Sequence, residues 1–302
     1  MSFPVVDLHC DLLAYLAMNP DRTPNDRIAR CSLPQLEEGK VILQTLAIYA
    51  ETGPYSLLCG LKQLELFQTF AKKKTPTRFL PAFESASAFS LENEPLDAVF
   101  ARLDKILSQI DPLYISLTWN GENRYGGGTG ANIGLKNDGK ELLAYLSGKG
   151  VAIDLSHATD ALSRGMLNEI DQKNLDLRIL ASHCNFRSIH DHERNLPDDV
   201  AKEVINRNGL IGLVFYSKFL DTPAQLVDQI EHGLELGGQN ALAFGADFFH
   251  LDDFDEIADE GGFFPAMGDS SKYPSILQEL EKIFSPMQLE KIASKNALAF
   301  LT

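Results

Sequence analysis

The chain has 302 residues, of which 44% are hydrophobic and 23% are charged. A chain of this size and composition can bury a substantial core, so a disordered or fibrous protein is excluded. Its 42 acidic and 27 basic side chains give a formal net charge of −15, which repels nucleic acid phosphates and anionic membranes. We therefore expect neither nucleic acid nor a membrane as a partner.

The cysteines and the N-terminal sequence favour a cytoplasmic protein. Four cysteines occur without a C-x-x-C pair, a usage typical of reduced thiols rather than of a disulfide framework. The opening sequence MSFPVVDLHCD has no basic segment followed by an apolar stretch, as a signal peptide would. No later segment approaches the roughly 20 apolar residues of a spanning helix.

Short apolar segments alternate with longer segments of helical spacing along the whole chain. The predicted strands are residues 5–8, 41–49, 78–83, 113–118, 151–155, 178–182, 209–216 and 241–245. Helices are predicted at residues 55–72, 91–108, 138–147, 160–170, 197–207 and 223–236, and two more at 274–284 and 286–300. Several of these helices begin with Asp, Ser or Pro, which favour a first turn.

Eight strands interleaved with helices in about 300 residues predict an α/β fold of the (β/α)8 TIM-barrel type. An open doubly wound sheet would more usually have about five to seven strands. No Pro/Gly/Ser-rich linker, internal repeat or low-complexity tract interrupts the chain. We therefore interpret residues 1–302 as a single barrel domain with C-terminal helices.

Side chains that can bind metals follow the predicted strands, where barrel enzymes carry their reactive groups. His9 and Asp11 end the first strand two residues apart, so both face the same side of an extended segment. The other strand ends carry, in chain order, Glu84, Asp154 with His157, His183, and Asp247.

Each of these residues alone is more often structural, capping a helix or satisfying backbone groups. The three histidines, together with Asp11, Glu84 and Asp247, would nevertheless be a costly polar cluster at one small opening without a cation. Imidazole together with carboxylate suits zinc, and two adjacent ions explain six such residues better than one. The sequence therefore predicts two Zn²⁺ ions in a metal-dependent hydrolase.

The residues and their order resemble the membrane (renal) dipeptidase family of dizinc peptidases, peptidase family M19. The motifs that carry the resemblance are His9-Cys10-Asp11, Glu84, Asp154-Leu155-Ser156-His157, Ser182-His183 and Arg194-Asn195-Leu196-Pro197-Asp198-Asp199. Similar segments at residues 209–216 and 271–274 extend the resemblance over nearly the whole chain. His-x-Asp alone is common among metal-dependent hydrolases, whereas the ordered set is specific.

The resemblance implies a bridged pair of zinc ions. His9 and Asp11 would bind one ion, His157 and His183 the other, and Glu84 would bridge them. Neighbouring amidohydrolases instead use a carboxylated lysine at the end of the fourth strand, but the fourth predicted strand contains no lysine. This absence favours the Glu bridge.

The resemblance also assigns residues to the substrate. Asp247 would be the catalytic group that handles protons, and Arg194 would bind the terminal carboxylate of a small peptide, a task suited to a planar bidentate donor. The dimers known in the family would add a second copy of the chain as a partner.

The chain departs from the family after the fourth strand. Where the animal enzymes have a His that is assigned to the scissile carbonyl, this chain has Trp119, followed by Asn120. Asn120 is a candidate replacement donor to the substrate. Trp119 has one N–H donor and either contacts the substrate or only packs.

Three further features are less specific. Residues 126–130 are glycine-rich but lack the G-x-x-x-x-G-K-[ST] pattern, so we expect a loop over the barrel opening rather than a phosphate cradle. His190 and His192 are expected in a solvated loop, with pocket lining as the alternative. Asp253 and Asp255 are expected in a solvated acidic loop, with contact to a substrate ammonium as the alternative.

We predict a zinc-dependent dipeptidase in which a metal-bridging hydroxide attacks the peptide carbonyl of L-L and also L-D dipeptides. Asp247 would take the hydroxide's proton and pass it to the leaving amine. One alternative is another C–N amidohydrolase, such as an N-acyl amino acid deacylase, whose substrate also has a carboxylate for Arg194. The other is a catalytically silent relative that binds a peptide or metal, which the intact set of charged residues argues against.

Overall fold

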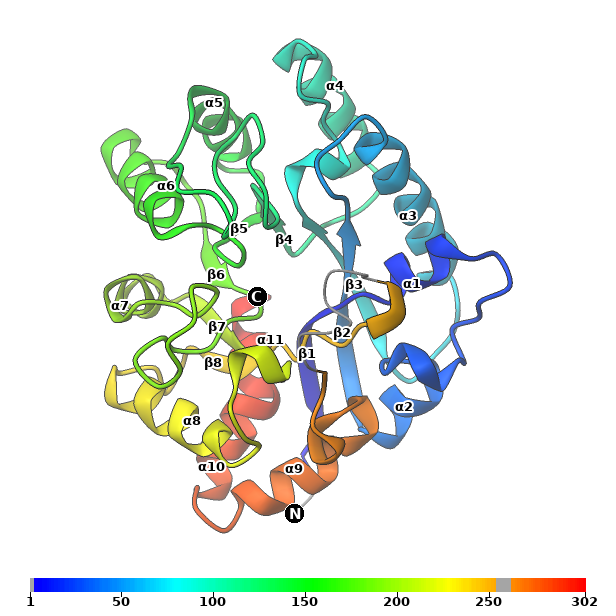
Figure 1. Cartoon of the computed structure of the whole chain (residues 1–302), viewed down its shortest axis with the longest axis vertical. Helices are drawn as coiled ribbons and strands as arrows, with labels where there is room; N and C mark the ends of the chain where they lie inside the picture. The colour runs from blue at the N-terminus through cyan, green and yellow to red at the C-terminus, as the bar shows by residue number, and fades with distance from the viewer. Residues whose placement is uncertain (1–2, 254–261) are drawn as a thin grey trace.

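The eight strands form a closed parallel barrel in sequence order in the computed structural model, which describes residues 3–253 and 262–302 (Figure 1). The strands are β1 (Val5–Cys10), β2 (Val41–Tyr49), β3 (Arg78–Glu84), β4 (Tyr114–Ser116), β5 (Ala152–Asp154), β6 (Ile179–Ala181), β7 (Leu210–Leu213) and β8 (Leu242–Phe244). Pairing of Asp7 in β1 with Phe244 in β8 closes the barrel. The predicted (β/α)8 fold is confirmed.

Helices surround the barrel (Figure 1). Those between the strands are α1 (Leu12–Met18), α2 (Leu33–Glu38), α3 (Ser56–Phe70), α4 (Leu96–Leu107), α5 (Asn137–Leu146), α6 (Asp160–Lys173), α7 (Asp198–Asn206) and α8 (Gln225–Glu235). After β8 come α9 (Tyr273–Leu280), α10 (Pro286–Glu290) and α11 (Asn296–Phe300). No helix in the described part of the chain is long and apolar enough to cross a bilayer.

Two features of the helices differ from the prediction. Helices α1 and α2 were not predicted, because seven and six residues are too few to display helical periodicity. The segment predicted as one helix at residues 286–300 contains a π-helical turn, Lys291–Lys295, between α10 and α11. This turn and α11 contact β1 and β8, so the end of the chain packs against the barrel.

Apolar side chains from strands around the barrel meet in one buried cluster. Its members include Val6, Leu43, Tyr114, Leu180 and Ala243, from five different strands. A larger cluster includes Ile48, Phe83 and Ile153 from the strands together with Leu64, Leu143 and Leu167 from the helices. Because both faces of the strands are covered, the C-terminal strand ends are held rigidly.

Two glycines allow the backbone to approach the carbonyl of Ser182, directly after β6. A Cβ atom on Gly212 would lie 2.0 Å from the Ser182 carbonyl oxygen, and one on Gly245 would lie 1.8 Å from it. Both distances are far below van der Waals contact, so only glycine fits at either position. The contact fixes Ser182 and, with it, the adjacent His183.

We predict that Gly245→Ala lowers the free energy of unfolding by about 1–3 kcal/mol or more, because the added methyl group overpacks a rigid site. Urea unfolding of the metal-free protein measures the effect. Gly121→Ala is the matched control, since a Cβ there meets no atom within 4 Å; its effect should stay within about 0.5 kcal/mol. Equal effects of the two changes would show that the close approach at Ser182 is not a constraint.

Candidate metal centre and active site

Six ionisable side chains meet at the C-terminal end of the barrel, and each is at most 8% exposed. They are His9, Asp11, Glu84, His157, His183 and Asp247, which end or closely follow β1, β3, β5, β6 and β8. Two subsets have their ligand atoms within 4.8 Å of one another, namely His9 with Glu84 and His183, and His9 with Asp11 and Asp247. The structure thus brings together the residues that the sequence predicted as one cluster.

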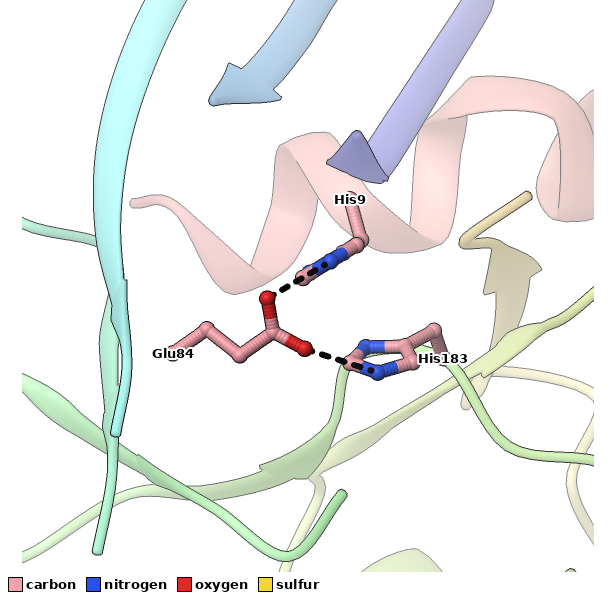
Figure 2. Close-up of side chains that lie close together, drawn as sticks. All are labelled: His9, Glu84 and His183. Carbon is pink, nitrogen blue, oxygen red and sulfur yellow. Dashed lines mark ion pairs between the residues drawn. The ribbon is translucent and has the colours of Figure 1, made fainter. Parts of the chain in front are cut away.

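Glu84 lies at the centre of the cluster, between His9 and His183 (Figure 2). Its Oε2 is 3.4 Å from His9 Nε2, while its Oε1 is 2.8 Å from His157 Nε2 and 3.6 Å from His183 Nε2. The two carboxylate oxygens therefore face different histidines, as a carboxylate shared by two cations would.

Several polar atoms of the cluster lack suitable partners. Among the described residues, buried His9 Nε2 and Asp11 Oδ1 have no hydrogen-bond partner, a costly condition for buried groups. Nε2 of His157 and Nε2 of His183 lie only 2.9 Å apart. Imidazole nitrogens and carboxylate oxygens directed at one another are the donor set that Zn²⁺ binds, so the residues fit divalent cations.

The Nδ1 atoms of two histidines have hydrogen-bond partners outside the cluster. His9 Nδ1 is 2.7 Å from the hydroxyl of Tyr114, which donates to the carbonyl of Leu8 and so accepts from His9. His157 Nδ1 is 2.8 Å from Asn120 Oδ1, an atom that only accepts. Both rings therefore donate from Nδ1, and Nε2 is the atom that each directs at the cluster.

A buried polar network holds the third histidine. His183 Nδ1 is 2.8 Å from Ser182 Oγ, which donates to Asp154 Oδ2 over 2.7 Å. Asp154 also accepts hydrogen bonds from the backbone N–H groups of Ser156 and Ser182 and from Ser116 Oγ. Asp154 is thus fully paired behind His183 and is not directed into the cluster.

Burial and charge set the protonation of the cluster. Burial, together with the positive charge of Arg194, lowers the pKa of His157 to about 4. Burial also lowers the pKa of His183 well below its ordinary value. Both rings are therefore neutral near pH 7, the state in which a histidine binds a metal.

The carboxyl groups of Asp11 and Asp247 respond in the opposite direction, whereas burial of Glu84 is outweighed by its neighbours His9 and His157, which lower its pKa. Burial raises the pKa of Asp247 to about 6, with Glu84 adding to the rise and His9 opposing it. Burial and the charge of Glu84 raise the pKa of Asp11 well above its ordinary value. The carboxylates therefore repel one another unless positive charge lies between them.

A cavity of about 990 Å³ leads from the cluster to the surface, and Trp119, Asn120 and Arg194 line it. The indole of Trp119 packs edge-on against Tyr49, with ring centroids 4.9 Å apart. The guanidinium of Arg194 lies 5.3 Å above the ring of Phe219, and its Nη2 donates to His157 Nε2 over 3.1 Å. A planar cation therefore borders both the cluster and the cavity.

The glycine-rich loop lies at the opening as expected, because Thr129 lines the cavity. His192 and Asp253 also line the cavity, where solvated loops were expected. Asp253 is not solvated, because it pairs with both Nη atoms of Arg22 at 2.7 and 2.6 Å. Asp255 lies outside the described residues.

Sequence reasoning missed Tyr114 and Ser182 as supports of the cluster. Ser182 precedes His183 in one of the recognised motifs, but its hydrogen bond to Asp154 depends on the pairing of β5 with β6. Tyr114 lies 105 residues from His9 and is completely buried. A buried phenol requires a partner, but the sequence does not say which.

Comparison with known proteins agrees with this geometry. The profile of the membrane dipeptidase family, peptidase family M19, matches residues 1–301. The chain belongs to the membrane dipeptidase family. Membership confirms the resemblance seen in the sequence. The chain is therefore a metallo-dipeptidase, because family M19 is a family of metallopeptidases.

Relatives of this M19 chain match it over nearly its full length. An uncharacterized dipeptidase of Schizosaccharomyces pombe is 25% identical, covering 98% of this chain and 80% of the relative. A solved M19 dipeptidase has a TM-score of 0.81 at 18% identity, over 100% of this chain and 98% of that one. A Rhodobacter sphaeroides metallopeptidase, solved with a phosphinate mimic of L-Ala-D-Ala, has a TM-score of 0.78 at 17% identity, covering 100% and 99%.

We predict that a divalent cation stabilises the chelator-treated protein, because it relieves the unpaired buried atoms. At a Zn²⁺ concentration about 100 times the dissociation constant, the gain is about 2.7 kcal/mol, visible as a rise in unfolding temperature. His9→Gln should remove most of this rise. His232→Gln, a control on α8 whose ring pairs with Asp198, should leave it intact; an equal loss in both would contradict a site at His9.

Proposed function

We propose that the chain hydrolyses dipeptides, L-D as well as L-L, with two zinc ions at the barrel opening. The position of Glu84 carries this proposal, because its two oxygens face different histidines at 3.4 and 2.8 Å. His9 and Asp11 would hold one ion, and His157 and His183 the other. The Rhodobacter sphaeroides relative, solved with a mimic of L-Ala-D-Ala, supports the inclusion of L-D dipeptides.

The zinc ions, when bound, supply Lewis acidity and lower the pKa of water. The chain's own contribution to proton transfer is Asp247. Its Oδ1 is 3.4 Å from His9 Nε2, and its side chain borders the cavity. Asp247 takes a proton from the attacking water and returns it to the nitrogen of the leaving amine, so one carboxyl serves as base and then as acid.

Arg194 binds the carboxylate at the end of the dipeptide. Arg194 is only 7% exposed, and its guanidinium is oriented by Cys184 Sγ, 3.5 Å from Nη1, and by the ring of Phe219. Two parallel N–H groups match the two oxygens of a carboxylate. Since Arg194 also borders His157, a bound carboxylate would lie next to the cluster.

Asn120 and Trp119 border the scissile bond in this proposal. The Asn120 side chain lines the cavity, and its Nδ2 donates to the substrate's carbonyl oxygen. Trp119, with its ring centroid 5.9 Å from that of His157, forms an apolar wall beside the same position.

We predict that Glu84→Gln lowers the occupancy of both zinc ions together, because a bridging carboxylate supports both. Elemental analysis of the purified protein measures this. His157→Gln should spare the ion held by His9 and Asp11 more than Glu84→Gln does. Glu169→Gln, a control at a buried position on α6, should retain the parental metal content; a full complement of metal in Glu84→Gln would refute the bridge.

We predict that Arg194→Lys lowers kcat/KM by about 10- to 100-fold for dipeptides with a free carboxylate, because a lysine keeps the charge but loses the paired geometry. Dipeptide amides lack this carboxylate, so the parent should cleave them more slowly and Arg194→Lys should lower their kcat/KM little further. Arg187→Lys is the control from the same loop, where the guanidinium pairs with Asp160. Equal losses for acids and amides would exclude carboxylate binding by Arg194.

We predict that Asp247→Asn lowers kcat by at least about 10²-fold with little change in KM, because the shape is kept and the proton carrier is lost. Metal content should be largely parental. The fall of kcat toward acidic pH, where Asp247 becomes protonated in the parent, should be absent from the residual activity. A variant that binds both ions and turns over within a few-fold of the parent would show that another group carries the proton, and His190 and His192 would be the next candidates.

A further inference from the structure

The carboxamide of Asn120 has two ends with different surroundings. Its Oδ1 lies 2.8 Å from His157 Nδ1, whereas its Nδ2 has no hydrogen-bond partner among the described residues and belongs to a side chain that lines the cavity. The oxygen thus contacts a residue of the metal cluster, and the nitrogen is left for the substrate. Only the second role was expected from the sequence.

A dedicated loop fixes Asn120 and His157 relative to each other. The backbone N–H of Gly130 donates to the Asn120 carbonyl over 2.9 Å, and Thr129 Oγ1 donates to the His157 carbonyl over 3.0 Å. A Cβ on Gly128 would lie 1.6 Å from the Trp119 carbonyl oxygen, so the loop is in direct contact with the segment that carries Asn120. His157 itself has a φ of 64°, a conformation that non-glycine residues adopt only when the surroundings impose it.

The ring orientation of His157 matters because its Nε2 faces two other acceptors and one donor. Nε2 is 2.8 Å from Glu84 Oε1 and 2.9 Å from His183 Nε2, and it accepts from Arg194 Nη2 over 3.1 Å. If the proton moved from Nδ1 to Nε2, it would bond to Glu84 and block the lone pair that a cation needs. An acceptor at Nδ1 prevents this exchange, because it binds the proton there.

We propose that Asn120 is a positioning residue that holds His157 in the Nδ1–H tautomer and so keeps Nε2 available to zinc. This inference rests on the proposed function for the assignment of His157 to an ion. The same amide then links the metal cluster to the substrate, since a cation on Nε2 strengthens the Nδ1–H donor, polarises the amide, and makes Nδ2–H a better donor.

Two substitutions at Asn120 distinguish the role of its carbonyl oxygen from that of its amide nitrogen. Asn120→Leu has a similar shape but no acceptor, whereas Asn120→Asp keeps an acceptor for His157 and loses the amide donor. Zinc affinity is measured on the full-length protein by competition with a chelator, and the tautomer of His157 in the metal-free protein by ¹⁵N NMR of its ring nitrogens. We expect Asn120→Leu to lower the affinity for one of the two zinc ions by about 10- to 100-fold and to populate the Nε2–H tautomer of His157. We expect Asn120→Asp to keep the Nδ1–H tautomer and zinc affinity at least equal to the parent's, with lower turnover.

Tyr114→Phe is the matched control, because it removes the acceptor of His9 Nδ1 instead. It should lower the affinity for the ion held by His9 and Asp11 and leave the tautomer of His157 unchanged. Urea unfolding of the metal-free Asn120→Leu protein, expected to match the parent within about 0.5 kcal/mol, separates a local effect from a general loss of structure.

The positioning role is overturned if Asn120→Leu binds both zinc ions with parental affinity, or if Asn120→Leu and Asn120→Asp lower the zinc affinity equally. Failure of the proposed function gives a different result, in which the parent binds zinc but cleaves no member of a panel of L-L and L-D dipeptides. In that case the zinc and NMR measurements still decide the role of Asn120.

Discussion

Mutual repulsion of buried carboxylates is the constraint around which the opening of the barrel is built. Asp11, Glu84 and Asp247 all lie within 4 Å of His9 Nε2, and all are nearly inaccessible to water. Burial raises the pKa of Asp11 and Asp247 because their charges lack solvent. A cluster of this kind is unstable as a set of free ions, so its persistence requires cations or protons between the carboxylates.

A closed barrel can bear this cost because its strands determine the positions of the groups before any ligand binds. All parallel strands end at one side, so residues far apart in sequence converge there. The backbone supplies the last adjustments: His157 and Asp247 have φ values of 64° and 62°, which cost roughly 1–3 kcal/mol each. The hydrogen bond from Asp247 N to the His9 carbonyl, 3.3 Å long, ties the second of these residues to β1.

Hydrophobic patterning predicted the eight strands and their order, because buried parallel strands appear as short apolar segments. The cluster residues could be predicted for the same reason: they directly follow those segments. Helices α1 and α2 could not, since short helices owe their stability to tertiary contacts rather than to local sequence. Strands β4 to β6 are each three residues long, shorter than predicted, because pairing with neighbouring strands rather than local pattern sets strand length.

The supports behind the three histidines were beyond prediction for a related reason. Tyr114, Asn120 and Ser182 are ordinary side chains whose roles depend on which strand lies beside which. Tyr114 reaches His9 across the barrel interior, and Asn120 reaches His157 beside a loop that pairs with the residues after β5. Identifying them requires coordinates, whereas identifying their histidines requires only the position after a strand.

The distribution of charge in the cavity gives the proposed reaction its direction. A dipeptide near neutral pH carries an ammonium at one end and a carboxylate at the other. The cavity is lined by the carboxylates Asp11 and Asp247 and by Arg194, whose guanidinium is 3.1 Å from His157. In the proposed assignment the carboxylate of the dipeptide pairs with Arg194 while its single peptide bond lies at the cluster. A peptide extended beyond its C-terminal residue would place an uncharged amide against Arg194 and leave that buried cation without a carboxylate, which is costly, so the charge of Arg194 would favour substrates with a single residue after the scissile bond.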